Sequence, residues 1–134
     1  MNILLDTHVL IWCFFSAKKI PDDIKDMITD PGNNIFYSVL SVWEIALKHG
    51  KRPEQMPVAP ERIIKECRRA GFMPLSFCND HVLAESELIL KDGSIDHKDP
   101  FDRMLLSQAI SEDMVFITYD PKMKAYDVPK MIWF

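Results

Sequence analysis

Features that mark secreted and membrane proteins are missing from this sequence. Its 134 residues include only three cysteines, Cys13, Cys67 and Cys78, an odd number without the paired spacing of a metal site. Free buried thiols in a reducing compartment are the simplest explanation. The N-terminal apolar run has no basic segment before it and is interrupted by Asp6, unlike a signal peptide, and no later run is long enough to span a membrane. We therefore expect a cytoplasmic protein.

Zinc-type motifs and a strongly basic composition are missing as well. The four histidines have no zinc-ligand spacing and form no HExxH motif, which argues against a zinc hydrolase. The net charge of −4 argues weakly against nucleic-acid binding. Residues 48–69 differ from the rest, because seven basic side chains there outnumber three acidic ones. Such a run is usually a solvated helix surface, and it gains interest only beside a site for phosphates.

The sequence does contain a regular alternation of short apolar runs and helical patterns. We expect strands at residues 3–5, 35–38, 72–75, 115–118 and 131–133. We expect helices at residues 9–15, 21–30, 39–49, 60–70, 80–90 and 101–111. Loops are expected at residues 52–59 and 91–98. The alternation predicts a parallel sheet with helices on both faces, in one domain spanning residues 1–134.

Proline and glycine refine three of these boundaries. Pro74 cannot donate a backbone hydrogen bond, so the strand at 72–75 is expected near an edge of the sheet. Gly50 and Gly71 each come directly after a helical pattern and are expected to close the third and fourth helices. The apolar run at 9–15 predicts a buried helix or one that reserves an apolar side for a partner.

Isolated carboxylates stand at the junctions of these elements. Asp6 and Asp120 directly follow predicted strands, and Glu44 lies in an apolar turn of the helix at 39–49. Asp99 and Asp102 open the helix at 101–111.

Each carboxylate also has a local explanation. Helix capping accounts for Asp99 and is the simpler explanation for Asp6 taken alone, and Asp120 repeats the same cap-then-proline arrangement. Asp102 completes something like a capping box. A pair with Lys48 accounts for Glu44 about as well as a functional role does.

The combination of four acids is harder to explain by local structure. In a parallel sheet the positions of Asp6, Glu44, Asp102 and Asp120 all lie at one edge, where ligands bind. Carboxylates crowded there would repel by about 4 kcal/mol per pair at 4 Å and an effective dielectric constant near 20. A divalent cation would compensate, and all-oxygen ligands favour Mg²⁺ or Mn²⁺ over zinc.

Four motifs occur together with these acids. They lie, in order, at residues 4–8 (LLDTH), 41–45 (SVWEI), 97–103 (HKDPFDR) and 116–120 (FITYD). In their order and spacing they resemble the PIN-domain ribonucleases, and within these the VapC-type toxins of bacterial toxin–antitoxin pairs. The resemblance covers essentially the whole chain. Each motif alone is weak, whereas four in order are specific. Tyr119 departs from the family pattern, in which a small or basic residue is more familiar.

The resemblance implies a three-layer α/β/α sandwich with a central parallel sheet of four or five strands. It implies that Asp6, Glu44, Asp102 and Asp120 are the catalytic residues and bind the metal. Supporting roles are implied for three further residues. Thr7 and Thr118 would place hydroxyls near the metal or its waters. Asp99 would act first as a helix cap and second as a contributor to the metal site from outside the direct ligands. The implied partners are an RNA substrate, a cognate antitoxin and a second copy in a homodimer.

The chemistry implied by such a site is hydrolysis of RNA phosphodiester bonds by a metal-activated water, leaving a 5′-phosphate and a 3′-hydroxyl. No side-chain nucleophile is required. The basic run could then hold RNA phosphates, with binding that weakens as salt rises. The candidate RNA-binding residues are Lys48, Lys51, Arg52, Lys65 and Arg69.

Two other classes of protein stay open at this point. A phosphate-accepting signalling domain also clusters acids at strand ends, but it needs paired acids after the first strand and a lysine after a late one. Here Thr7 follows Asp6, and Tyr119 follows the strand at 115–118. The other class is a binding module that keeps the PIN fold without activity. Aromatic residues bear on the partners as well. By default Trp12, Phe14, Phe15 and Trp43 are all core, whereas the resemblance implies that some of them form a groove for an antitoxin.

Overall fold

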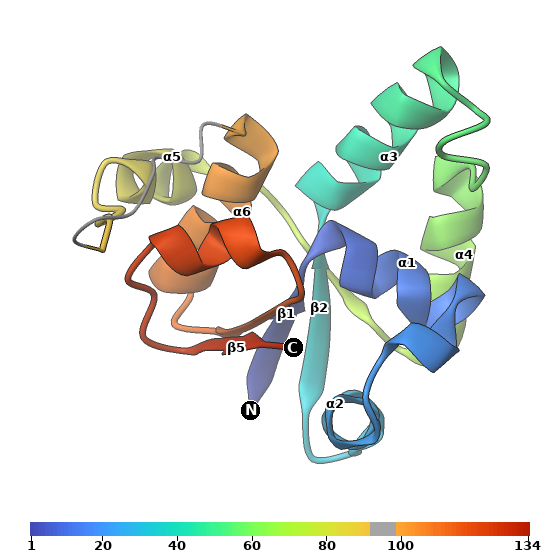
Figure 1. Cartoon of the computed structure of the whole chain (residues 1–134), viewed down its shortest axis with the longest axis horizontal. Coiled ribbons are helices and arrows are strands. Elements are labelled where there is room, and N and C mark those ends of the chain that lie inside the picture. Colours follow the sequence, from blue (N-terminus) through green and yellow to red (C-terminus); the bar gives the residue numbers. More distant parts are fainter. Residues whose placement is uncertain (92–98) are drawn as a thin grey trace.

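The computed structural model describes residues 1–91 and 99–134, which form a five-stranded, fully parallel sheet (Figure 1). The strands are β1 (Asn2–Leu5), β2 (Asn34–Ser38), β3 (Met73–Leu75), β4 (Val115–Thr118) and β5 (Met131–Trp133). Their order across the sheet is β3-β2-β1-β4-β5, so β3 with Pro74 lies at an edge, as predicted. In Figure 1, β1 and β2 run upward into the starts of the helices that come after them.

Helices connect the strands and cover both faces of the sheet. The α-helices are α1 (Thr7–Phe15), α2 (Asp22–Thr29), α3 (Val39–Lys51), α4 (Pro60–Ala70), α5 (Asn79–Glu85) and α6 (Pro100–Ser111). Two short 3-10 helices, not predicted, are η1 (Ala17–Lys19) and η2 (Pro121–Ala125). Residues 52–59 contain no helix or strand, as expected. The expected loop at 91–98 lies, apart from Lys91, outside the described residues.

Side chains of β1 alternate between two hydrophobic cores. Ile3 and Leu5 belong to a core built with α1 to α4, whereas Leu4 belongs to a core built with α6 and η2. All three side chains are fully buried, because β1 is the central strand and both of its faces are covered. The continuous apolar run therefore predicted a central strand correctly, and the three layers form an α/β/α sandwich.

The helix predicted at residues 80–90 is wrong beyond Glu85. There the backbone leaves the helix and bonds to the segment around η2. The N–H of Lys91 donates to the carbonyl of Ala125, the N–H of Asp127 donates to that of Ile89, and Leu90 forms an isolated bridge with Tyr126. These contacts are remote in sequence, so the local pattern contained no signal for them.

Two smaller predictions also differ from the structure. Gly50 does not close α3, which continues to Lys51 and is capped by Arg52. The helix stops there because Pro53 disfavours helical backbone at the residue that precedes it. Cys67 is buried as expected, but Cys78 is exposed, because it caps the N-terminus of α5 at the surface. All three thiols are free, and no described helix is long and apolar enough to cross a membrane.

Candidate active site

Asp6 connects the central strand to the first helix. Its carboxylate accepts hydrogen bonds from the Thr7 N–H at 2.7 Å and from the Thr118 hydroxyl at 2.6 Å, and the residue is only 3% exposed. Burial raises the pKa of Asp6 to about 6; the bonds from Thr118 and Thr7 partly offset this, and the charges of Glu44 and Asp120 add to it. The carboxylate is therefore both a helix cap and a buried, electrostatically strained acid.

Glu44 lies on the buried side of α3 and is paired with Lys48 one turn later. The Lys48 ammonium donates to Glu44 Oε2 at 2.7 Å; the Glu44 side chain is 7% exposed and that of Lys48 is 48% exposed. Burial acts to lower the pKa of Lys48, but the hydrogen bond and charge of Glu44, together with Asp99 and Asp102, raise it overall. The lysine therefore stays charged and balances part of the acidic site.

Two further acids stand at the start of α6. The Asp99 carboxylate accepts hydrogen bonds from the N–H groups of Phe101 at 2.9 Å and Asp102 at 3.2 Å, as expected of a helix cap. Pro100 comes next, at the first helical position. Asp102, half-buried, lies in the first turn of the same helix.

Asp120 comes just after β4 and caps η2 by accepting a hydrogen bond from the Lys122 N–H at 2.9 Å. Its own N–H donates to the Thr118 hydroxyl oxygen at 3.1 Å, and that hydroxyl in turn donates to Asp6. Thr118 thus holds Asp6 and the backbone of Asp120 in a fixed relation.

These acids surround one small cavity of about 190 Å³ at the C-terminal ends of the strands. Its lining comprises Asp6, His8, Glu44, Lys48, Asp99, Asp102, Asp120 and Lys122. The four carboxylates predicted to converge, those of Asp6, Glu44, Asp102 and Asp120, therefore lie around one cavity, and Asp99, predicted mainly as a helix cap, lines it too. Among the described residues that line the cavity, five acids outnumber two lysines, so the net charge of this lining is negative.

A family model described as "PIN domain" matches residues 3–129. The chain belongs to the PIN-domain family. A search of curated proteins found no match.

Three solved structures share this PIN fold along the whole chain. They are VapBC2 from Rickettsia felis bound to a DNA fragment from its promoter (TM-score 0.67, 20% identity), DNA-bound VapBC from Salmonella typhimurium (0.63, 19%) and VapBC-1 from nontypeable Haemophilus influenzae (0.65, 16%). Each alignment covers 100% of this chain and 97–98% of the other. At these identities the likeness establishes the fold, which confirms the predicted sandwich.

His8 and Lys122 line the cavity of this PIN domain but were not predicted as site residues. His8 is the second residue of α1, and its ring lies edge-on to those of Tyr119 and Trp12, at centroid distances of 5.9 and 6.4 Å. Burial and the charge of Lys48 lower the pKa of His8 against the opposing effect of the acids, so the ring is neutral at pH 7. The only available signal was position, because each residue lies two places after a site aspartate.

The remaining predicted residues are more dispersed. The Thr7 hydroxyl, expected near the metal, lies 2.9 Å from that of Ser41 and joins α1 to α3 without lining the cavity. Lys51 and Arg52 lie at the far end of α3. Lys65 and Arg69 lie on α4 and line a separate shallow hollow there. Of the five predicted RNA-binding residues, only Lys48 reaches the acidic cavity.

The donor set of the cavity suits Mg²⁺ or Mn²⁺, because its acidic ligands are all carboxylate oxygens. As they stand, however, no three His, Cys, Asp or Glu side chains in the described part of the chain are arranged around one common point for a metal. The Lys48 ammonium is bound to Glu44 Oε2, one of the two oxygens that this carboxylate offers. A bound ion would therefore require rotation of carboxylate side chains, and at Oε2 it would compete with the Lys48 ammonium.

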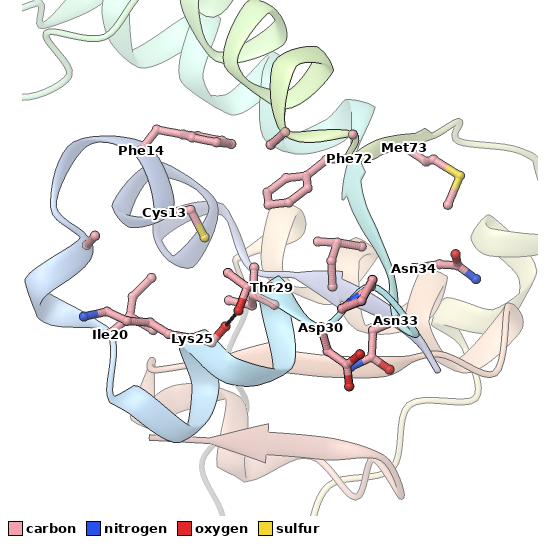
Figure 2. Close-up of a pocket in the computed structure, with 16 residues that line it drawn as sticks. Cys13, Phe14, Ile20, Lys25, Thr29, Asp30, Asn33, Asn34, Phe72 and Met73 are labelled. Carbon is pink, nitrogen blue, oxygen red and sulfur yellow. Dashed lines mark hydrogen bonds between the residues drawn. The ribbon is translucent and has the colours of Figure 1, made fainter.

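A larger cavity of about 540 Å³ lies near the opposite end of the sheet, where β2 and β3 begin (Figure 2). Apolar side chains such as Phe14 and Phe72 form much of its wall. Polar groups at its rim are already engaged: the Thr29 hydroxyl donates to the Lys25 carbonyl, and Asp30 accepts from the Gly32 N–H. Because it contains no cluster of acids, this cavity is not the candidate catalytic site.

Proposed function

We propose that this PIN domain is a Mg²⁺-dependent endoribonuclease that serves as the toxin of a type II toxin–antitoxin pair. The observation that carries the proposal is the convergence of five carboxylates on one small cavity at the strand ends. Membership of the PIN family and the likeness of fold to three VapBC complexes support it.

The roles of the residues depend on their surroundings. Asp6, Glu44, Asp102 and Asp120 would hold Mg²⁺ or Mn²⁺, with Asp6 oriented by Thr118 and by the Thr7 N–H. Held there, such an ion would supply a lower pKa for a coordinated water and stabilisation of the charge that develops on the phosphate. Asp99 keeps the start of α6 in place by capping it.

The two lysines of the cavity complete the site. Lys48 and Lys122 are the lysines among the described residues of its lining, and they suit contacts with the RNA phosphates on either side of the cleaved bond. The neutral His8 ring adds no charge, and its packing against Tyr119 fixes the wall of the cavity.

The partners we propose rest on the same resemblance. The substrate is RNA in the cytoplasm, and a small antitoxin covers the site until it is removed. The toxin itself forms a homodimer. Residues Lys51, Arg52, Lys65 and Arg69 would add weaker, salt-dependent contacts with RNA that extends beyond the cavity.

The decisive experiment compares wild type with Asp6→Asn on defined single-stranded RNAs, in Mg²⁺, in Mn²⁺ and in chelator. We expect cleavage by wild type only with metal. Removal of a residue that only hydrogen-bonds to a metal ligand typically lowers activity roughly 10–100-fold. Asp6→Asn should lower activity by more than this, because Asp6 is proposed to bind the metal directly. Asp22→Asn is the matched control, because that side chain is 98% exposed and lies outside the cavity.

The alternatives give different results. Equal activity of wild type and Asp6→Asn would disprove the proposed site. A wild-type protein that binds RNA but never cleaves it would be an inactive binding module. A signalling domain would instead take up phosphate covalently from a small phosphodonor. The sequence disfavours this interpretation, because such a domain needs a lysine directly after β4, where this chain has Tyr119.

A further inference from the structure

Trp43 presents most of its indole ring to solvent. The residue is 56% exposed, and neither it nor Phe101 belongs to the two hydrophobic cores. The two rings contact each other edge-on, with centroids 5.2 Å apart and planes at 70°. This aromatic pair joins α3 to α6, the helices that contribute Glu44 and Asp102 to the cavity.

Neither ring lines the acidic cavity, but on each helix the ring residue is next in sequence to an acid that does. Trp43 immediately precedes Glu44 in α3. Phe101 lies between Asp99 and Asp102, and its N–H donates to the Asp99 carboxylate at 2.9 Å. Both rings are thus attached to backbone that positions carboxylates of the site.

We propose that Trp43, braced by Phe101, stacks on an unpaired base of the RNA whose cleaved phosphodiester lies over the acidic cavity. Every nucleobase offers a face for such stacking, and only a base outside a duplex can present it to a protein ring. The substrate class is therefore single-stranded RNA or a loop. The inference rests on the proposed nuclease function and deepens it.

A second copy of the chain is the main competing occupant. Val39, Trp43 and Leu47 recur every four residues and form an exposed apolar stripe along α3, with exposures of 44%, 56% and 38%. RNA is favoured because Trp43, in the middle of this stripe, packs edge-on against Phe101 beside the acids. A base stacked on that pair brings its own phosphate to the cavity, which a second copy of the chain does not.

The test measures binding of short single-stranded RNAs in the Asp6→Asn background, where cleavage cannot interfere. Trp43→Ala should weaken binding roughly 5- to 100-fold, and Trp43→Phe should retain most of it. Binding of a duplex of the same sequence should change little in either variant. Leu83→Ala is the matched control, since Leu83 is 69% exposed on α5 and does not line the cavity.

Abasic nucleotides locate the stacked base. In the protein that retains Trp43, one abasic position should weaken binding about as much as Trp43→Ala does, and the two changes together should weaken it no further. With Asp6 present, Trp43→Ala should raise KM more than it lowers kcat. Unchanged binding by Trp43→Ala, or additive effects at every abasic position, would overturn the proposal.

Other outcomes separate this proposal from the one it rests on. Loss of a dimer by Trp43→Ala in sedimentation, with RNA affinity intact, would assign the stripe to a second copy and overturn stacking. Failure of the wild type to cleave any RNA, with Trp43-dependent binding preserved, would refute the nuclease but support stacking. Absence of RNA binding in the Asp6→Asn background would overturn stacking while leaving the cleavage assay to judge the nuclease.

Discussion

At 3% exposure, the Asp6 carboxylate lies in surroundings that disfavour its charge. Burial and the nearby acids Glu44 and Asp120 raise its pKa to about 6, and two hydrogen bonds offset only part of this. A side chain that is ionised at pH 7 under these conditions lowers the stability of the metal-free protein. Such local instability is expected where a fold holds groups for chemistry rather than for packing.

The first prediction concerns stability and pH in chelator. Asp6 ionises near 3.8 in the unfolded chain and near 6 in the folded protein, so the folded state retains a proton between these values. The stability that comes from this retained proton is therefore lost as pH rises from about 4 to 6, at about 1.4 kcal/mol for each unit of difference between the two pKa values. We expect Asp6→Asn to raise the free energy of unfolding by about 1–3 kcal/mol at pH 7, measured in urea.

The same substitution should have little effect near pH 4, where Asp6 is largely protonated in the folded protein. Asparagine can still accept the Thr7 N–H bond, so the helix cap survives. Asp22→Asn, at a fully exposed position, should show no such difference between the two pH values. Equal destabilisation by Asp6→Asn at both pH values would contradict the raised pKa.

At the scale of elements, two glycines show what a local pattern can and cannot predict. Gly71 ends α4 with φ of 77°, its N–H bonded to the Arg68 carbonyl and that of Phe72 to the Cys67 carbonyl. This is a Schellman motif, and Phe72 completes it by packing on the core. Gly50 instead lies inside α3. The residue type is the same, so the difference comes from the residues on the C-terminal side of each glycine.

The second prediction compares alanine at these two glycines. A Cβ atom would meet nothing within 4 Å at either position, so backbone conformation alone should decide the effect. Gly71→Ala should lower the free energy of unfolding by about 1–2 kcal/mol, because left-handed backbone is unfavourable for alanine. Gly50→Ala should raise it by about 0.5–1 kcal/mol within the helix. Urea unfolding of both variants tests this, and effects of equal sign would refute it.

The strands and most α-helix bounds were predictable to within a few residues, because apolar runs and caps act over short distances in sequence, whereas η1 and η2 were not predicted. The end of α5 was not, since its backbone is captured by hydrogen bonds to Ala125 and by the bridge of Leu90 to Tyr126. Contacts between segments so far apart in sequence leave no trace in either segment alone.

At the scale of the whole molecule, topology explains why the acidic site was predictable. Parallel strands all end at one edge, so carboxylates that come after strands or open neighbouring helices must converge. The directions of individual side chains depend on tertiary packing instead. That is why His8 and Lys122 were missed and why the Thr7 hydroxyl contacts Ser41 rather than the cavity.

The convergence of charge leads to a prediction about metal removal. Five carboxylates face two lysines in the cavity, so a divalent cation that binds there should stabilise the folded chain. The gain is about 2.7 kcal/mol when the free ion is a hundredfold above its Kd, equivalent to a rise of several degrees in Tm. Thermal unfolding with Mg²⁺ and with chelator measures it.

Site specificity requires two controls, because added salt also screens the repulsion among the acids. NaCl at matched ionic strength should raise Tm less than Mg²⁺ does. Glu44→Gln should abolish the additional rise, because it removes a buried carboxylate ligand. The Lys48 charge, no longer paired with Glu44, would then balance the remaining acids of the cavity in place of the metal. Asp22→Asn should keep the rise. If Mg²⁺ and NaCl act alike on the wild type, the convergence of acids does not create a metal site, and Lys48 and Lys122 suffice to balance it.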